Sequence, residues 1–244
     1  MLEITNLSKF YLSGKRAVKN LSVTLEPGQI IGLFGENGAG KTTFIKSVLH
    51  LLSHSGQVML DGERITNRNI ARLSFGTCEH SFFPNLSIQD HRSFLEEHFE
   101  RFNGKRFDTL VAFFDLPQHR PIRLFSTGQK NQFEVILAVS QGADYIFLDE
   151  PFAGNDIFNR EDFYKVLLGI LESHETLLLS THLIEEVEPI INRVLLMRKG
   201  QLIGDITTDQ LEEQGLSLMQ YVKQACHYQA GQVANVLQAL NGEE

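Results

Sequence analysis

The stretch GQIIGLFGENGAGKTTF, residues 28–44, constrains the fold more than any other part of this chain. It begins with an apolar run of strand length, passes through a glycine-rich turn, and ends in a run that predicts a helix. A buried strand that is followed by a glycine turn and then by a helix is typical of an α/β fold with a parallel sheet. The segment Gly35–Thr42, GENGAGKT, also matches the pattern G-x-x-x-x-G-K-[ST].

This pattern predicts a loop that holds phosphate groups. Its glycines accept positive φ and leave no side chain between the backbone N–H groups and a phosphate. Lys41 can reach the outer phosphates, the Thr42 hydroxyl can ligate Mg²⁺, and a helix beginning near Gly40 adds its dipole. The expected nucleotide contacts are Gly35, Glu36, Asn37, Gly38, Ala39, Gly40, Lys41, Thr42 and Thr43.

Acidic residues follow a second apolar run, YIFLDE, at residues 145–150. Ligands of parallel sheets sit at the carboxyl ends of the strands, where Asp149 and Glu150 are expected to emerge. Asp149 suits a Mg²⁺ partner, and Glu150 suits a base that orients and deprotonates an attacking water. His182 follows another apolar run and begins a helix, from which its ring can contact the γ-phosphate; a surface cap is the plainer alternative.

The rest of the chain alternates between strand and helix patterns. Short strands are expected in residues 2–11 and 21–26, and a hairpin in residues 56–65 has Asp61-Gly62 at its turn. Further strands are expected near residues 72–79, 144–150, 176–182 and 193–200, with helices near 159–173 and 183–191. This alternation predicts a mostly parallel core sheet covered on both faces, with an N-terminal antiparallel β-subdomain.

A helical insert is expected at about 86–142. One predicted helix presents Ile88, Phe94, Leu95, His98, Phe99 and Phe102 on one face, and a second presents Phe107, Leu110, Val111 and Phe114. The expected division is a nucleotide-binding domain over 1–205 that contains this insert, followed by a helical tail over 206–244.

Charge and cysteine content restrict the class of protein. The net charge of -8 argues against a dedicated nucleic-acid binder, which usually has a basic face. Cys78 and Cys226 match no metal or redox spacing, which favours a reducing cytosol. No apolar run approaches the length of a membrane span, so a membrane role requires a separate partner.

The segment FSTGQ, residues 125–129, precedes another apolar periodic run. Ser126 and Gln129 have the spacing of a capping box, which is enough to start a helix. The same helix N-terminus can also direct free N–H groups at an anion, and Gly128 permits close approach. Since the chain already has one phosphate loop, this second start suits the γ-phosphate of a nucleotide held by a different copy.

The motifs GENGAGKT, FSTGQ, YIFLDEP, AGND and STH, in this order, resemble those of the ATP-binding cassette (ABC) ATPase of a transporter. The resemblance covers about residues 1–205 and implies a P-loop NTPase, or RecA-like, core that hydrolyses ATP with Mg²⁺. It further implies a head-to-tail dimer in which Ser126, Gly128 and Gln129 touch the partner's nucleotide. Asp156 then lies at the seam of that dimer.

Tyr11 matches the aromatic residue that stacks on adenine in this family, although a hairpin or core tyrosine is an alternative. Three departures from the family pattern stand out. Thr127 and Phe125 replace the usual glycine and leucine of the signature, Glu79 stands where a glutamine normally faces Mg²⁺ and water, and Asn155 replaces an apolar residue. We expect activity to survive, because Lys41 and the acidic pair are retained.

The resemblance implies an integral membrane permease as a partner, with the chain at the inner face of the membrane in the cytoplasm. A second cassette, identical or different, completes the dimer. Phe82, Phe83 and Pro84 suit a hydrophobic dock for a permease helix, or they pack the insert. The short cassette, Glu79 and the helical tail are similar to the ABC-2 and antibiotic-resistance exporter branch.

Two other functions are weighed against this one. A soluble ABC ATPase acting on nucleic acid or ribosomes is expected to carry a long coiled coil or two cassettes, and this chain has one short insert. A small-molecule P-loop kinase is expected to have an arginine-rich lid and gives no reason for FSTGQ or STH. The transported substrate and its direction stay open.

Overall fold

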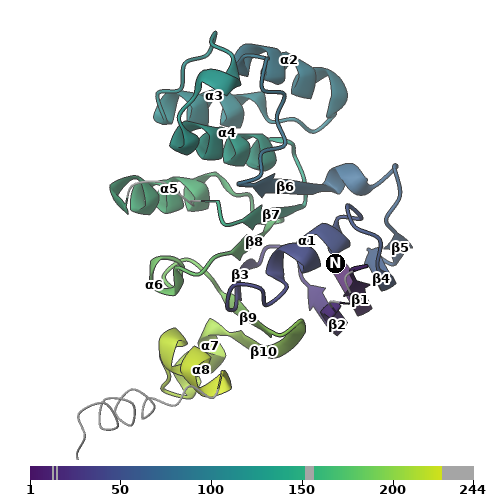
Figure 1. Cartoon of the computed structure of the whole chain (residues 1–244). Helices are drawn as coiled ribbons and strands as arrows, with labels where there is room; N and C mark the ends of the chain where they lie inside the picture. Colours follow the sequence, from purple (N-terminus) through teal and green to yellow (C-terminus); the bar gives the residue numbers. More distant parts are fainter. Residues whose placement is uncertain (13, 15, 152–156, 227–244) are drawn as a thin grey trace, which may run out of the picture.

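The computed structural model describes residues 1–226 except 13, 15 and 152–156. A six-stranded sheet forms the centre of the described chain, in the order β10-β9-β3-β8-β7-β6 (Figure 1). All neighbours are parallel except β10, which pairs antiparallel with β9, so the expected mostly parallel core is confirmed. The strands are β3 (Ile30–Phe34), β6 (Leu73–Thr77), β7 (Tyr145–Asp149), β8 (Thr176–Ser180), β9 (Arg193–Arg198) and β10 (Gln201–Thr207).

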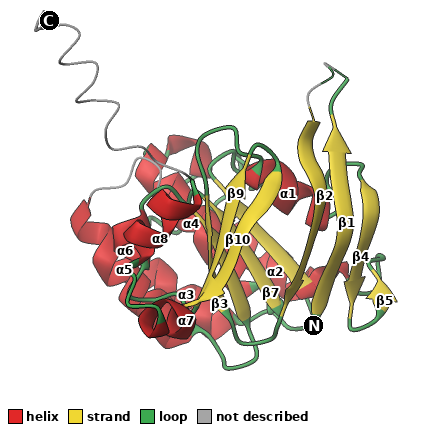
Figure 2. Ribbon diagram, turned by 90° about the horizontal axis from the view of Figure 1, so that it is seen from below, coloured by secondary structure: helices red, strands yellow, loops and turns green. Residues whose placement is uncertain are grey.

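A second, antiparallel sheet has the order β2-β1-β4-β5 and stands beside the core sheet (Figure 2). Its strands are β1 (Leu2–Phe10), β2 (Arg16–Leu25), β4 (Ser55–Leu60) and β5 (Glu63–Arg64). Asp61 and Gly62 both have positive φ, 52° and 79°, which gives the two-residue hairpin turn expected from the Asp-Gly pair. The expected N-terminal antiparallel subdomain is therefore confirmed.

Helices cover both faces of the core sheet. Helix α1 (Lys41–Val48) packs between the two sheets, and its buried Phe44 and Ile45 join a hydrophobic core built from both (Figure 2). Helix α5 (Ile157–Ile170) and the short α6 (Ile184–Val187) lie on the opposite face (Figure 1). Residues of β7 and β8 are all buried, as parallel strands covered on both faces require.

The helical insert consists of α2 (Ile88–His98), α3 (Gly104–Phe113) and α4 (Thr127–Ser140), with short 3₁₀ turns at Ile70–Arg72 and Ile122–Leu124 before and within it. The predicted face of the second helix is confirmed, since Phe107, Leu110 and Val111 are buried. The prediction for the first helix was wrong in part. His91 is buried with Ile88 and Leu95. Phe94 and His98, which the sequence pattern assigns to the same face, are exposed, and their rings stack on each other at 4.2 Å.

The C-terminal part contains one strand that the sequence analysis did not assign. Strand β10 crosses the expected domain boundary at residue 205 and ends at Thr207. The tail is helical after it, with α7 (Thr208–Glu213) and α8 (Leu218–Ala225), each starting with a capping box. Among the described helices, none has the length and apolar character needed to cross a membrane.

Candidate nucleotide-binding site

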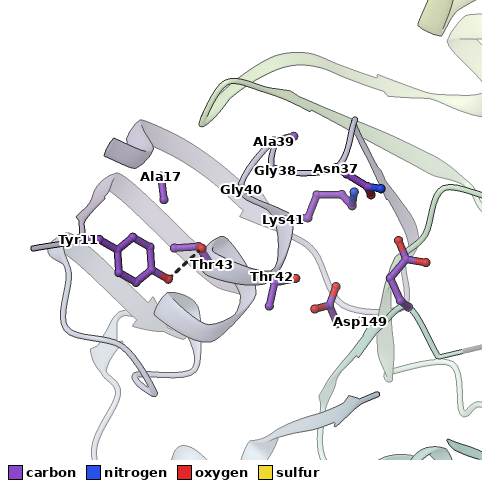
Figure 3. Close-up of a pocket in the computed structure, with 11 residues that line it drawn as sticks. Tyr11, Ala17, Asn37, Gly38, Ala39, Gly40, Lys41, Thr42, Thr43 and Asp149 are labelled. Atoms are coloured by element: carbon purple, nitrogen blue, oxygen red, sulfur yellow. Dashed lines mark hydrogen bonds between the residues drawn. The ribbon is translucent and has the colours of Figure 1, made fainter. Parts of the chain in front are cut away.

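A pocket opens where the carboxyl ends of β3 and β7 meet the start of α1 (Figure 3). Its lining combines the loop between β3 and α1, the hairpin between β1 and β2, and the acidic end of β7. The lining residues are Tyr11, Ala17, Asn37, Gly38, Ala39, Gly40, Lys41, Thr42, Thr43, Asp149 and Glu150. The structure thus brings most of the predicted nucleotide contacts together, while Gly35 and Glu36 precede the part of the loop that lines the pocket.

The loop before α1 requires glycine at its two ends. Gly35 has φ 151° and Gly40 has φ 107°, and a Cβ added at either would lie 2.3 Å from a backbone oxygen, of Met197 and of Ala17 respectively. The loop is therefore pressed between β9 and β2. No side chain caps α1, so its first backbone N–H groups remain available to an anion in the pocket.

Lys41 is the first residue of α1 and is only 7% exposed. Its ammonium donates to the Gly35 carbonyl oxygen at 2.7 Å, so the side chain lies back across the loop (Figure 3). A cation beside the uncapped start of α1 attracts the outer phosphates of a nucleotide.

The carboxylate of Asp149 fits a divalent cation. Asp149 is 4% exposed, and its Oδ1 has no hydrogen-bond partner among the residues that the structure describes. A buried carboxylate oxygen is costly to leave without a partner. Because Thr42 lines the same pocket, a hydroxyl and a carboxylate face the place where phosphates would bind, which is a donor set that Mg²⁺ accepts.

Glu150 and His182 meet at the adjoining edge of the sheet. His182 Nδ1 lies 3.0 Å from Glu150 Oε2, and the Glu150 backbone N–H donates to the Ser180 carbonyl oxygen at 2.8 Å. Glu150 adopts φ 49°, a left-handed conformation that is unfavourable for a glutamate and is common at functional sites. Of the three side chains predicted for catalysis, which include Lys41, Glu150 and His182 are thus paired, and the His182 side chain is 63% exposed.

The Ser126–Gln129 segment has the geometry that its sequence predicts. The Ser126 hydroxyl oxygen accepts from the Gln129 N–H at 3.2 Å, and Gln129 Oε1 accepts from the Ser126 N–H at 3.0 Å, which confirms the capping box. Ser126, Gly128 and Gln129 are absent from the lining of the pocket. The N–H groups at the start of α4 therefore serve a different location from the phosphate loop of the same chain.

Tyr11 lies in the pocket where adenine stacking is expected, whereas Glu79 lies outside the pocket. Tyr11 lines the pocket, is 39% exposed, and its hydroxyl lies 3.2 Å from Thr43 Oγ1. Glu79 is not part of the lining, because its carboxylate pairs with Lys46 on α1. The geometry gives its expected place at Mg²⁺ no support. Asn155 and Asp156 lie outside the described residues.

Sequence reasoning missed two features around the site. Ala17 lines the pocket from β2, and its only signal is its place in the hairpin that also carries Tyr11. Glu134 on α4 is 1% exposed, and it stands as a charged residue inside the apolar run QFEVILAV. A glutamate within an apolar run is the sequence signal for such a contact, because a buried carboxylate needs hydrogen-bond donors from another element.

The fold and the site define a P-loop ATPase with a helical insert. The family model described as ABC transporter matches residues 18–153, which is more than half of the chain. The chain therefore belongs to the ABC transporter family, whose members bind ATP, and it is an ATPase of that family.

Relatives and solved structures agree with this assignment. ABC transporter ATP-binding protein YtrB of Bacillus subtilis (strain 168) is 26% identical over 222 residues, which cover 89% of this chain and 76% of the relative. ABC transporter ATP-binding protein NatA of the same organism is 27% identical over 219 residues, which cover 83% of this chain and 88% of the relative.

Among solved structures, an ATP binding subunit of an ABC transporter has a TM-score of 0.79 at 22% identity, covering 91% of this chain and 98% of that one. A dimeric post-hydrolysis state of the ATP-binding cassette MJ0796, bound to ADP and Pi, has a TM-score of 0.73 at 20% identity, covering 85% and 98%. These likenesses support the same fold, with a mostly parallel P-loop core.

Proposed function

We propose that this chain is the energy-coupling subunit of a membrane exporter and works as a head-to-tail dimer with two ATP molecules at the interface. One observation carries the proposal: the pocket is lined by the phosphate loop and the acidic pair, while the capped start of α4 lies outside its lining. A helix start with free N–H groups and a glycine suits a phosphate that another copy presents.

Within the dimer, each residue has a defined task. Lys41 and the N–H groups of the loop bind the β- and γ-phosphates, and the ring of Tyr11 faces adenine. Thr42 and Asp149 hold Mg²⁺, which supplies charge neutralisation on the phosphate oxygens when it is bound.

Hydrolysis depends on the pair at the edge of the pocket. Glu150 orients a water molecule and accepts its proton, because its carboxylate is held at the end of β7 beside the phosphates. His182 donates to Glu150 Oε2 through Nδ1 at 3.0 Å, which fixes the direction of the carboxylate. Ser126, Gly128 and Gln129 of the other copy close over the same phosphate.

An aromatic surface on the helical insert suits a helix of the membrane permease. Phe83 is 50% exposed and Phe94 is 37% exposed; their rings lie 5.6 Å apart, and Phe94 also stacks on His98. Phe82 packs inward against Phe133 at 5.9 Å and so serves the insert itself. Exposed aromatic side chains of this kind mark interaction surfaces.

The cellular setting of the chain is part of the same proposal and rests on the family resemblance. The chain sits at the cytoplasmic face of the cell membrane through the permease, and its resemblance to the ABC-2 and antibiotic-resistance branch favours export. The second cassette is a copy of this chain or a different one. A multi-span membrane protein encoded beside this gene would support the transport role, whereas a helicase or nuclease there would contradict it.

The catalytic assignment is tested by turnover. Replacing Glu150 with glutamine removes the base while keeping its shape, and we expect ATP turnover to fall by about 10²–10⁴-fold with ATP binding retained. Glu213→Gln is the matched control, since Glu213 is an exposed carboxylate on α7 outside the pocket lining, and it should keep wild-type turnover. Unchanged turnover in Glu150→Gln would refute the role of the base.

A further inference from the structure

A buried carboxylate on α4 holds the loop that follows β6. Glu134 is 1% exposed, and its oxygens accept from the Ser81 backbone N–H at 3.0 and 3.1 Å and from the Ser81 hydroxyl at 2.5 Å. Burial raises the pKa of Glu134, and hydrogen bonds from Ser81 and from the Thr77 backbone counteract that rise. An apolar residue would fill this position without any desolvation cost, so the carboxylate is there to hold the loop.

The same loop is attached to the nucleotide pocket at its other end. Thr77, the last residue of β6, pairs with Asp149 in the parallel ladder between β6 and β7. Two residues later, the carboxylate of Glu79 pairs with Lys46 on α1, the helix that begins with Lys41. The Thr77–Ser81 loop is therefore tied to the phosphate loop's helix on one side and to α4 on the other.

Helix α4 carries this attachment to the second phosphate contact. Ser126 is the N-cap of α4, and Glu134 lies eight residues further along the same continuous helix. In Figure 1, α4 lies between the other helices of the insert and the edge of the sheet that β6 forms. A displacement of the helix start is transmitted along a rigid helix to Glu134, and from there to Ser81.

We propose that Glu134 is a positioning residue, and that its contact with Ser81 couples the two ATP sites of the dimer through the Thr77–Ser81 loop. This rests on the proposed head-to-tail dimer, in which the phosphate loop of one chain belongs to one site and its Ser126–Gln129 segment belongs to the other. ATP bound in one site moves α4, and the Thr77–Ser81 loop passes that movement to Asp149 in the other site. Coupling between sites is reciprocal, so it makes ATP binding cooperative.

The experiment measures steady-state turnover against ATP concentration for the full chain. We expect a Hill coefficient above 1 for the wild type, and a value near 1 with a reduced kcat for Ser81→Ala, which removes only the hydroxyl. ATP affinity of the monomer and the thermal unfolding midpoint should stay near wild type, which separates positioning from a structural defect. Ser81→Thr restores the hydroxyl and should restore the cooperativity.

The matched control is Ser93→Ala. Ser93 is an exposed serine of the same insert whose hydroxyl donates to the Gln89 carbonyl oxygen within α2, so its loss should leave the Hill coefficient unchanged. Glu134→Leu should act as Ser81→Ala does, because it removes both oxygens that accept from Ser81. The double variant should be no worse than either single one, as expected of two residues that act through one contact.

The outcomes separate this inference from the proposed function. Ser81→Ala with wild-type cooperativity and kcat overturns the inference, and so does a wild-type dimer whose turnover shows a Hill coefficient of 1. Failure of Ser81→Thr to restore cooperativity also counts against it. A Glu150→Gln chain that stays monomeric with ATP and Mg²⁺, alone and with any natural partner cassette, contradicts the proposed dimer itself.

Discussion

Replacing Glu175 with glutamine tests what joins the helical insert to the core sheet. Arg106 on α3 reaches into the core, where its guanidinium forms a two-pronged ion pair with Glu175 at 2.8 and 2.9 Å. The same guanidinium donates to the carbonyl oxygens of Val139, near the end of α4, and of Ile170, at the end of α5. Both charged side chains are only 4% exposed, so one residue fastens three elements.

The expected cost follows from this burial. In Glu175→Gln the guanidinium keeps its two carbonyl partners and the exposed Glu172 carboxylate at 3.8 Å, but it loses the buried opposing charge. A buried pair broken on one side costs about 3–5 kcal/mol. Asp108→Asn is the matched control: it breaks the pair of Asp108 with Arg92 between α3 and α2, where the Asp108 side chain is 56% exposed. An exposed pair of this kind contributes about 0.2–1 kcal/mol.

Urea unfolding followed by far-ultraviolet circular dichroism measures both variants. We expect the midpoint of Glu175→Gln to fall well below that of Asp108→Asn at a similar m-value, so that the difference reports stability. Equal midpoints for the two variants would refute the assignment of Arg106 and Glu175 as the fastening point. The result also bears on function, since α4 carries the proposed second phosphate contact.

Two further predictions concern the phosphate loop and acid stability. Gly40→Ala should destabilise the chain more than Gly38→Ala, because both have positive φ but only at Gly40 does a Cβ meet the Ala17 oxygen at 2.3 Å; thermal unfolding without nucleotide compares them. Burial raises the pKa of Asp144, but hydrogen bonds from two arginines lower it overall. The stability that this carboxylate contributes to the fold is therefore fully present above pH 3.8, and it is lost as the pH falls through the lowered pKa of the folded state. Asp144→Asn should therefore be less stable than wild type at pH 7, with the difference vanishing in strong acid; a constant difference at all pH values would contradict this.

The phosphate loop and the acidic pair were predictable because their signals are local. A strand, a glycine turn and a helix follow one another in the sequence, and parallel strands place their carboxyl ends on one edge. Glu150 follows β7 and His182 follows β8, so both lie at this edge and pair there, although 32 residues separate them in the sequence. The capping box of Ser126 and Gln129 is local in the same way.

Features that depend on distant partners were not predictable. Periodicity showed that α2 has an apolar face but did not decide between Phe94 and His91, since the buried side is set by packing against Phe133 on α4. The ion pair between Glu79 and Lys46 joins two elements whose contact no spacing reveals. Strand β10 did have a local signal, the Lys199-Gly200 turn with φ 48° and 81°, which sequence analysis overlooked.

The central claim is that each ATP is bound between two cassettes, which contact it from opposite sides. Sedimentation of Glu150→Gln with ATP and Mg²⁺, in which slow hydrolysis preserves the bound nucleotide, measures this most directly. We predict a dimer that forms only with ATP and that is lost when Ser126→Arg is added, while the monomer with Ser126→Arg still binds ATP. A strictly monomeric Glu150→Gln chain, alone and with any natural partner cassette, would contradict the claim.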